Sequence, residues 1–142
     1  MKYKQSRFNE SVIEEKNVYG EIVSIKQDDY SKEILLLGIK LLTGEHKGCQ
    51  LIDKFSCTNG NSLAWKYLHL RACLGNPYKN NEPEEVDLDE LFIGKVILMD
   101  LTSFNYEDRY GMNRKKQKFI YKNTPQDVKI EKTDEEDPFL PF

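Results

Sequence analysis

The order of its structural segments most constrains the fold of this chain. Three segments rich in β-branched and aromatic residues come first, at residues 18–27, 33–42 and 49–57, and this composition is typical of strands. Two more strands are predicted at residues 95–104 and 117–122. A helix is predicted between the third and fourth strands, from apolar residues at a spacing of four, three and four: Leu63, Tyr67, Leu70 and Leu74.

This order predicts a mainly all-β protein, a five-stranded OB-fold barrel with one helix between strands 3 and 4. Gly75 and Pro77 end the helix, and a helical turn at residues 87–92 is expected to cover one end of the core. Gly38 interrupts the second strand, where a small barrel needs a bend or bulge. Split α+β folds can share the same order and stay an alternative.

The length of 142 residues predicts one domain with an appendage. We place the OB-fold domain at residues 1–123 and an acidic tail at residues 124–142. No apolar run approaches the roughly 18 residues of a membrane span, and the first residues do not form a secretory signal. The three cysteines, an odd number without Cys-x-x-Cys spacing, indicate buried reduced thiols in a cytoplasmic protein, the host cytoplasm if the protein is viral.

Catalytic patterns are missing from the sequence. His46 and His69 have no metal-ligand spacing, and Cys49 and Cys57 lie too far apart on one strand to chelate an ion. The glycines of residues 43–48 have neither the length nor the following helix of a phosphate-binding loop. We therefore predict no enzymatic activity, no cofactor and no metal.

Charge is distributed unevenly along the chain. The net charge is −3, which by itself argues against a nucleic-acid binder. Residues 104–122, however, contain six basic and two acidic residues, whereas residues 123–142 contain six acidic residues and two lysines. The protein thus combines one basic stretch with an acidic counterweight.

The basic stretch interleaves cations with aromatic rings, which is the composition that single-stranded DNA requires. Bases stack on aromatic rings, and lysine and arginine neutralise phosphates. The predicted binding residues are Phe104, Tyr106, Arg109, Tyr110, Arg114, Lys115, Lys116, Lys118, Phe119 and Tyr121. Further candidates lie on the third strand and in the first hairpin: Lys54, Phe55 and Tyr30.

Each of these residues has a structural alternative. Phe104 and Phe119 can equally be core residues. Tyr121 alternates with Phe119 and so lies on the same side of the strand, which means that Phe119 and Tyr121 are either both core residues or both stacking residues. The cations can form an ordinary solvated face. Tyr106 and Tyr110 are expected in an exposed loop, where stacking explains them better than burial. For Trp65 on the helix, packing or a partner contact is favoured over stacking.

The C-terminus ends in four carboxylates followed by Pro-Phe-Leu-Pro-Phe. The repelling charges and the two prolines predict a disordered segment, and its apolar tip suits capture by the basic, slotted surface of another protein. Packing of this segment on its own domain is the alternative. The predicted partner-binding residues are Asp134, Glu135, Glu136, Asp137, Pro138, Phe139, Leu140, Pro141 and Phe142.

This tail resembles the acidic tip of bacterial and phage single-stranded-DNA-binding proteins. Asp134 to Asp137 match its acidic run, Leu140 its aliphatic position, and Pro141 and Phe142 its terminal pair. The inserted Pro138-Phe139 and the lack of a long Gly/Gln-rich linker depart from the pattern, and the match covers only nine residues.

The resemblance implies sequence-tolerant coating of single strands in replication or recombination, with recruitment of partner proteins through the tail. RNA stays possible, because stacking and phosphate contacts do not inspect the 2′-hydroxyl. A homo-oligomer is also possible, since related proteins occur as monomers, dimers and tetramers. The rival functions are a protein–protein adaptor that binds no nucleic acid, and a small DNA-processing enzyme or its inhibitor.

Overall fold

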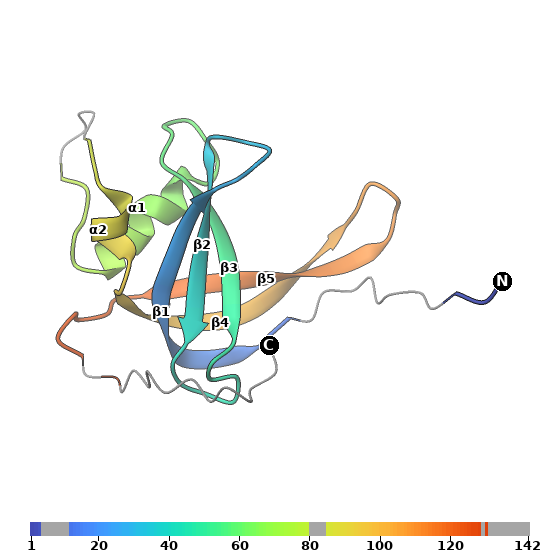
Figure 1. The fold of residues 1–142 in the computed structure, drawn as a ribbon, viewed down its shortest axis with the longest axis horizontal. Helices are drawn as coiled ribbons and strands as arrows, with labels where there is room; N and C mark the ends of the chain where they lie inside the picture. The colour runs from blue at the N-terminus through green and yellow to red at the C-terminus, as the bar shows by residue number, and fades with distance from the viewer. Residues whose placement is uncertain (4–11, 80–84, 129, 131–142) are drawn as a thin grey trace.

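The protein is mainly β, as predicted, and its five strands form one antiparallel sheet (Figure 1). The computed structural model describes residues 1–3, 12–79, 85–128 and 130. The strands are β1 (Glu15–Gln27), β2 (Ile34–Leu41), β3 (Gln50–Ser56), β4 (Val96–Glu107) and β5 (Asn113–Lys122). Their order in the sheet is β3-β2-β1-β4-β5, so β3 and β5 are its two edges. Within the described residues no backbone pairing joins these edges, and the sheet is open.

The predicted helix is present as α1 (Ala64–Cys73), between β3 and β4 in the sequence. Tyr67, Leu70 and Leu74 of the predicted apolar face are buried in the core. A second, short helix, α2 (Leu88–Phe92), occupies the predicted helical turn, and the side chain of Asp87 caps it by accepting backbone N–H groups. Phe92 on α2 is completely buried, so this turn covers one end of the core as expected.

An aromatic cluster joins the helices to the sheet. Phe55 of β3 stacks on Tyr67 of α1, with ring centroids 5.9 Å apart. Phe92 meets both rings edge-on at 5.8 and 6.0 Å. Such edge-to-face and offset contacts stabilise a core beyond the area that they bury.

A bulge bends β1 where it passes Gly38 of β2. The register between the two strands shifts between Ile22 and Ser24, opposite Ile39 and Gly38. A Cβ atom at position 38 would collide with the Ser24 hydroxyl, so the glycine permits this close approach. The prediction of a bend or bulge at Gly38 is confirmed, although the extra residue belongs to β1.

Side chains bridge the two open edges of the sheet. The Tyr121 hydroxyl on β5 donates a hydrogen bond of 2.6 Å to Oδ2 of Asp53 on β3. Lys66 of α1 pairs with Oδ1 of the same carboxylate at 2.8 Å, and the His69 ring lies 2.9 Å from the backbone oxygen of Tyr121. Burial, followed by the charge of Asp53, raises the pKa of Tyr121 well above its usual value.

Two predictions about local structure are corrected. The strands predicted at residues 95–104 and 117–122 left a long loop between them at residues 105–116. This loop is a short turn, because β4 continues to Glu107 and β5 already begins at Asn113. The cysteines are not all buried: Cys73 is buried, Cys49 is half-buried and Cys57 is exposed.

The segments directly before β1 and after β5 attach to the body. Gln117 holds the segment before β1, since its amide accepts from Ile13 N–H and donates to the Ile13 carbonyl, both at 2.8 Å. Past β5, Thr124 is buried, and its backbone N–H donates to the Cys73 carbonyl at the end of α1. The predicted partner-binding residues 134–142 lie outside the described residues. Of the helices described, neither is long and apolar enough to cross a lipid bilayer.

Candidate nucleic-acid interface

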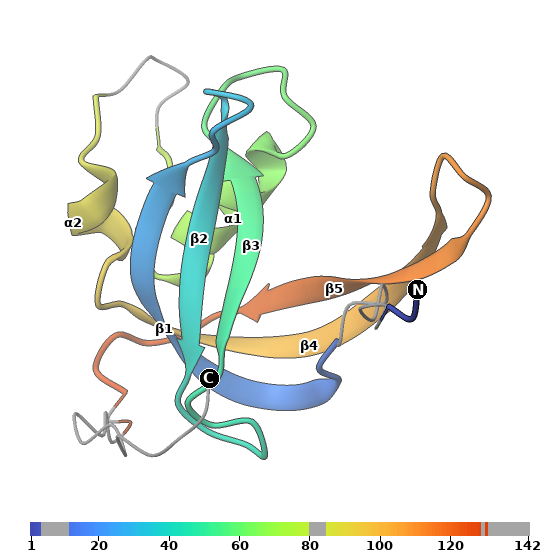
Figure 2. The same ribbon diagram turned by 45° about the vertical axis from the view of Figure 1, so that its right-hand side comes forward.

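The β4–β5 hairpin projects from the rest of the sheet as a two-stranded ribbon (Figure 2). The last residue of β4 that pairs with β1 is Leu101, opposite Glu15. From Thr102 to Glu107 β4 pairs with β5 alone. Within the described residues, no third strand pairs with this part of the hairpin.

Register divides the ribbon into two faces. Residues directly opposite each other on antiparallel strands point to the same side, and successive residues alternate. Leu101 opposite Phe119 and Met99 opposite Tyr121 are buried and mark the core side. The other side, here called the outward face, carries aromatic, cationic and aliphatic side chains: Phe104, Tyr106, Arg114, Lys116, Lys118 and Ile120.

Two aromatic rings stand next to two cations on the outward face. The Phe104 and Tyr106 rings are 44% and 40% exposed, and their centroids are 6.2 Å apart. Across the ribbon, Phe104 is opposite Lys116 and Tyr106 is opposite Arg114. Flat apolar surface and positive charge thus alternate on one exposed surface, which is the combination that an unpaired strand requires.

The cations of this face differ in their partners. Arg114 Nε pairs with Asp108 Oδ2 at 2.6 Å, and Lys122 Nζ pairs with Asp100 Oδ1 at 2.9 Å. Lys116 and Lys118 form no ion pair with the described residues and are both exposed. Two residues of a strand rise about 6.8 Å, so these lysines are spaced at about twice the 3.4 Å rise of one nucleotide in stacked DNA.

Asp108 organises the turn at the end of the ribbon. Its Oδ1 accepts the backbone N–H of Tyr110 at 2.8 Å and of Met112 at 3.0 Å, and Gly111 adopts φ +78°. The Arg114 side chain donates to the same carboxylate, and this bond is the main cause of the lowered pKa of Asp108. The Arg109 guanidinium lies 5.1 Å from the centre of the Tyr110 ring.

The structure brings most of the predicted residues together. Phe104, Tyr106, Arg114, Lys116 and Lys118 share the outward face, and Arg109 and Tyr110 lie in the turn beside it. Lys115 is on the ribbon's opposite side, with Asn105.

Three predicted stacking residues are instead core residues. Their exposed fractions are 2% for Phe55, 5% for Phe119 and 5% for Tyr121. Because buried rings cannot stack on bases, the prediction of base stacking is wrong for all three. Phe119 and Tyr121 point inward because they alternate with exposed Lys118 and Ile120. Lys54 and Tyr30 are exposed, but they lie on β3 and in the β1–β2 loop rather than on the ribbon.

Sequence reasoning missed two exposed apolar residues of the ribbon. Met112 is 53% exposed in the turn, and Ile120 is 41% exposed on the outward face. The exposure of Ile120 could have been predicted, because it alternates along the strand with Lys118 and Lys122. For Met112 no local pattern distinguished an exposed side chain from a buried one.

Two other polar clusters lie away from the ribbon. Glu15, Glu45 and His46 bring one ligand atom each within 4.8 Å of one another, a geometry in which a cation could be held. Glu15 already accepts the Glu45 backbone N–H, at 2.9 Å. Nothing in these contacts selects a metal.

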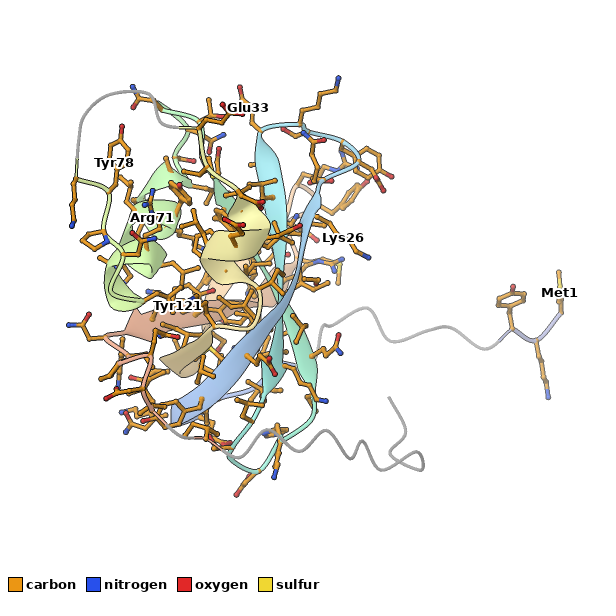
Figure 3. The ribbon with its side chains drawn as sticks, turned by 60° about the vertical axis from the view of Figure 1, so that its left-hand side comes forward. Met1, Lys26, Glu33, Arg71, Tyr78 and Tyr121 are labelled. Atoms are coloured by element: carbon orange, nitrogen blue, oxygen red, sulfur yellow. The ribbon has the colours of Figure 1, made fainter. Side chains whose placement is uncertain are left out.

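A buried arginine forms the second cluster. Arg71 is 4% exposed, and its guanidinium lies 5.7 Å from the Tyr67 ring centre and 5.9 Å from that of Tyr78. Figure 3 shows Arg71 and Tyr78 together beside α1. Because this buried cation also donates to the Asn76 carbonyl at 3.0 Å, it stabilises the end of α1.

No protein-family model matches this chain, and no curated protein matches it either.

Proposed function

We propose that this chain is a sequence-tolerant single-stranded-DNA-binding protein that holds the strand on the outward face of the β4–β5 ribbon. One observation supports this most directly: Phe104 and Tyr106 are exposed beside Lys116 and Lys118 on a single projecting surface. The proposal requires neither a catalytic group nor a cofactor. RNA would meet the same stacking and phosphate contacts.

The physical basis is the sum of two kinds of contact. A base stacked on an aromatic side chain contributes about 1–3 kcal/mol, whichever base it is. Each phosphate neutralised on a single strand adds about 0.7 to the slope of log K against log salt. Lys116 and Lys118 are the best placed for this role, because Arg114 already pairs with Asp108.

We also propose that the fold is an OB-fold barrel that is partly open. An OB-fold is a five-stranded Greek-key barrel, and its loop between strands 4 and 5 takes part in binding oligonucleotides. Support comes from the position of α1 between β3 and β4 and from the bridge between Tyr121 and Asp53. Closure of such a barrel would bring together β3 and β5, which are the two strands that this bridge connects.

In the cell, we propose a role in DNA replication or recombination, in the style of a bacteriophage protein acting in the host cytoplasm. The acidic segment of residues 134–142 would recruit replication or recombination proteins. This part of the proposal is supported by the sequence resemblance of that segment alone.

A salt-dependent titration tests the proposal. Fluorescence anisotropy would compare labelled oligo-dT with duplex DNA of the same length for the whole chain. Phe104→Ala and Tyr106→Ala should each weaken binding to oligo-dT by about 1 kcal/mol or more. Lys116→Ala should flatten the salt plot by about 0.7, and the double change with Lys118→Ala by about 1.4.

A matched control uses Lys47, an exposed lysine in the β2–β3 loop. Lys47→Ala should leave the salt slope unchanged because this residue is not on the ribbon. Equal effects of Lys47→Ala and Lys116→Ala would show that only the general charge matters. Absence of binding to oligo-dT at low salt would refute the proposed function.

The adaptor remains a second candidate because of one feature of α1. Trp65 and Leu68, one helical turn apart, are 58% and 45% exposed. An exposed apolar stripe of this kind suits a protein partner. If the adaptor function is correct, Trp65→Ala should abolish capture of a partner while the chain shows no response to oligo-dT.

A further inference from the structure

The turn at the end of the ribbon exposes two large apolar side chains on a hydrogen-bonded backbone. Tyr110 is 73% exposed and Met112 is 53% exposed. The turn is closed by hydrogen bonds from Asp108 N–H to the Met112 carbonyl, at 2.9 Å, and from Gly111 N–H to the Asp108 carbonyl, at 3.0 Å. Because these hydrogen bonds already restrain the turn, a ligand that covers these side chains loses less conformational entropy from this loop than from an unbonded one.

We propose that this turn recognises the junction between single-stranded and double-stranded DNA, by stacking Tyr110 and Met112 on the last base pair of the duplex. The inference rests on the proposed function, since the single strand that leaves the junction would lie on the outward face. It goes further by naming the preferred substrate, which is a partly unwound duplex rather than a continuous single strand.

The energetics of stacking favour a junction over an intact duplex. A side chain that inserts between paired bases must first unstack them, which costs a few kcal/mol for each step. The last base pair at a junction already presents one uncovered face, so an apolar side chain can cover it without that cost. Tyrosine and methionine both present flat or adaptable apolar surface for such a contact.

Charge at the turn fits the phosphates around a junction. Arg109 lies against the Tyr110 ring, with its guanidinium carbon 5.1 Å from the ring centre. Lys115 projects from the ribbon face opposite the outward face. With Lys116 on the outward face, cations therefore occur on both sides of the ribbon close to the turn, where the two strands of a junction diverge.

The arrangement along the ribbon supports the same substrate. Moving from the body toward the turn, the outward face presents Lys118, then Phe104 and Lys116, then Tyr106 and Arg114. A strand that follows these side chains arrives at Tyr110 and Met112. The turn is thus continuous with the proposed single-strand surface.

The test compares four DNAs by anisotropy under one salt condition. They are oligo-dT, a blunt duplex, a closed circular duplex as competitor, and the same short duplex carrying an oligo-dT overhang. We expect the overhang substrate to bind about tenfold tighter than oligo-dT of the overhang's length, which is about 1.4 kcal/mol and is the order expected for one extra stacking contact. A 2-aminopurine at the last base pair should also lose fluorescence on binding.

Two variants locate the preference. Tyr110→Ala with Met112→Ser should lower the ratio of the overhang-substrate affinity to the oligo-dT affinity from about ten to about one. Lys47→Ala, the control in the β2–β3 loop, should leave the ratio between the two substrates unchanged. Circular dichroism of each variant would verify that it folds.

The possible failures are distinguishable. Equal binding to the overhang substrate and to oligo-dT would overturn the junction inference and leave the proposed function intact. The inference would also be overturned if the double variant lost affinity equally for both DNAs, because the turn would then serve single strands in general. Absence of oligo-dT binding would reject the proposed function itself.

Discussion

The bridge between the open edges of the sheet leads to a quantitative prediction for Tyr121→Phe. The substitution removes the hydroxyl that donates to Asp53 Oδ2 at 2.6 Å and keeps the buried ring. Lys66 and the Lys54 backbone N–H both contact Oδ1, so among the described residues Oδ2 loses its hydrogen-bond donor. Asp53 is 6% exposed, so water cannot readily replace that donor. A hydrogen bond to a charged group contributes about 1.5–3 kcal/mol, and we expect the free energy of unfolding to fall by this amount.

Urea denaturation followed by circular dichroism would measure this loss. With a dependence of about 1.5–3 kcal/mol per molar urea, the midpoint should move down by about 0.5–2 M. A double-mutant cycle with Asp53→Ala isolates the pair, and its coupling energy should fall in the same range. Tyr30→Phe is the matched control, because Tyr30 is 98% exposed. A loss below about 0.5 kcal/mol for Tyr121→Phe, within the usual effect of a surface substitution, would refute the reasoning.

Alkaline pH gives an independent measure of the burial of the same Tyr121 hydroxyl beside Asp53. Burial and the Asp53 charge raise the pKa of Tyr121 above its ordinary value of 10.0. The folded protein therefore keeps a proton that the unfolded chain loses, so this stabilisation is complete below about pH 10 and is lost as pH rises toward the folded pKa. Over that window each pH unit removes about 1.4 kcal/mol through this group. Tyr121→Phe should lack this component, and an unchanged alkaline profile would contradict it.

Three further predictions concern other parts of the fold. Gly20→Ala should destabilise the protein by about 1–3 kcal/mol through overpacking, because the new Cβ would lie 2.5 Å from Ile39 Cγ2 and 2.7 Å from Met99 Cε. Thermal denaturation would measure this loss of stability, and adding Met99→Leu should recover part of it. The Ile13 backbone N–H donates a hydrogen bond of 2.8 Å to the Gln117 side chain, so Gln117→Ala should accelerate hydrogen exchange at the Ile13 amide. An unchanged exchange rate would mean that other contacts hold this segment. The Asp108 carboxyl should titrate below 3.8 in an NMR pH series, because Arg114 donates to its charged form; the stabilisation is present above pH 3.8 and is lost as pH falls through the lowered pKa. Arg114→Gln should move that midpoint up, and no movement would exclude Arg114 as the cause.

The candidate interface was predictable in part, because alternation along a strand is a local property. The sequence Lys118, Phe119, Ile120, Tyr121 and Lys122 separates two faces of β5, and the structure has those two faces. Alternation does not say which face is buried, and so Phe119 and Tyr121 could be predicted as either core or stacking residues. Only the packing of β5 against α1 and the sheet placed them inside.

Loop length was the main error of sequence reasoning on the ribbon. Apart from Tyr106, residues 105–107 and 113–116 are polar or charged, and their composition resembles a loop more than a strand. They pair nevertheless, as Asn105 with Lys115 and Glu107 with Asn113, because backbone hydrogen bonds between two strands do not require apolar side chains. The resulting ribbon is longer and its turn shorter than composition indicates.

By itself, the sequence determined the number and order of the strands, the position of α1 and the chemical character of the basic stretch, since these follow from periodicity and composition within short segments. Tertiary structure decided what depends on residues distant in the chain. It joined Asp53 to Tyr121 across 68 positions, buried Phe55 against Tyr67, and set Phe104 and Tyr106 opposite Lys116 and Arg114. Contacts of this kind depend on strand register, which no local pattern encodes, because register is selected by the fit of the whole buried face.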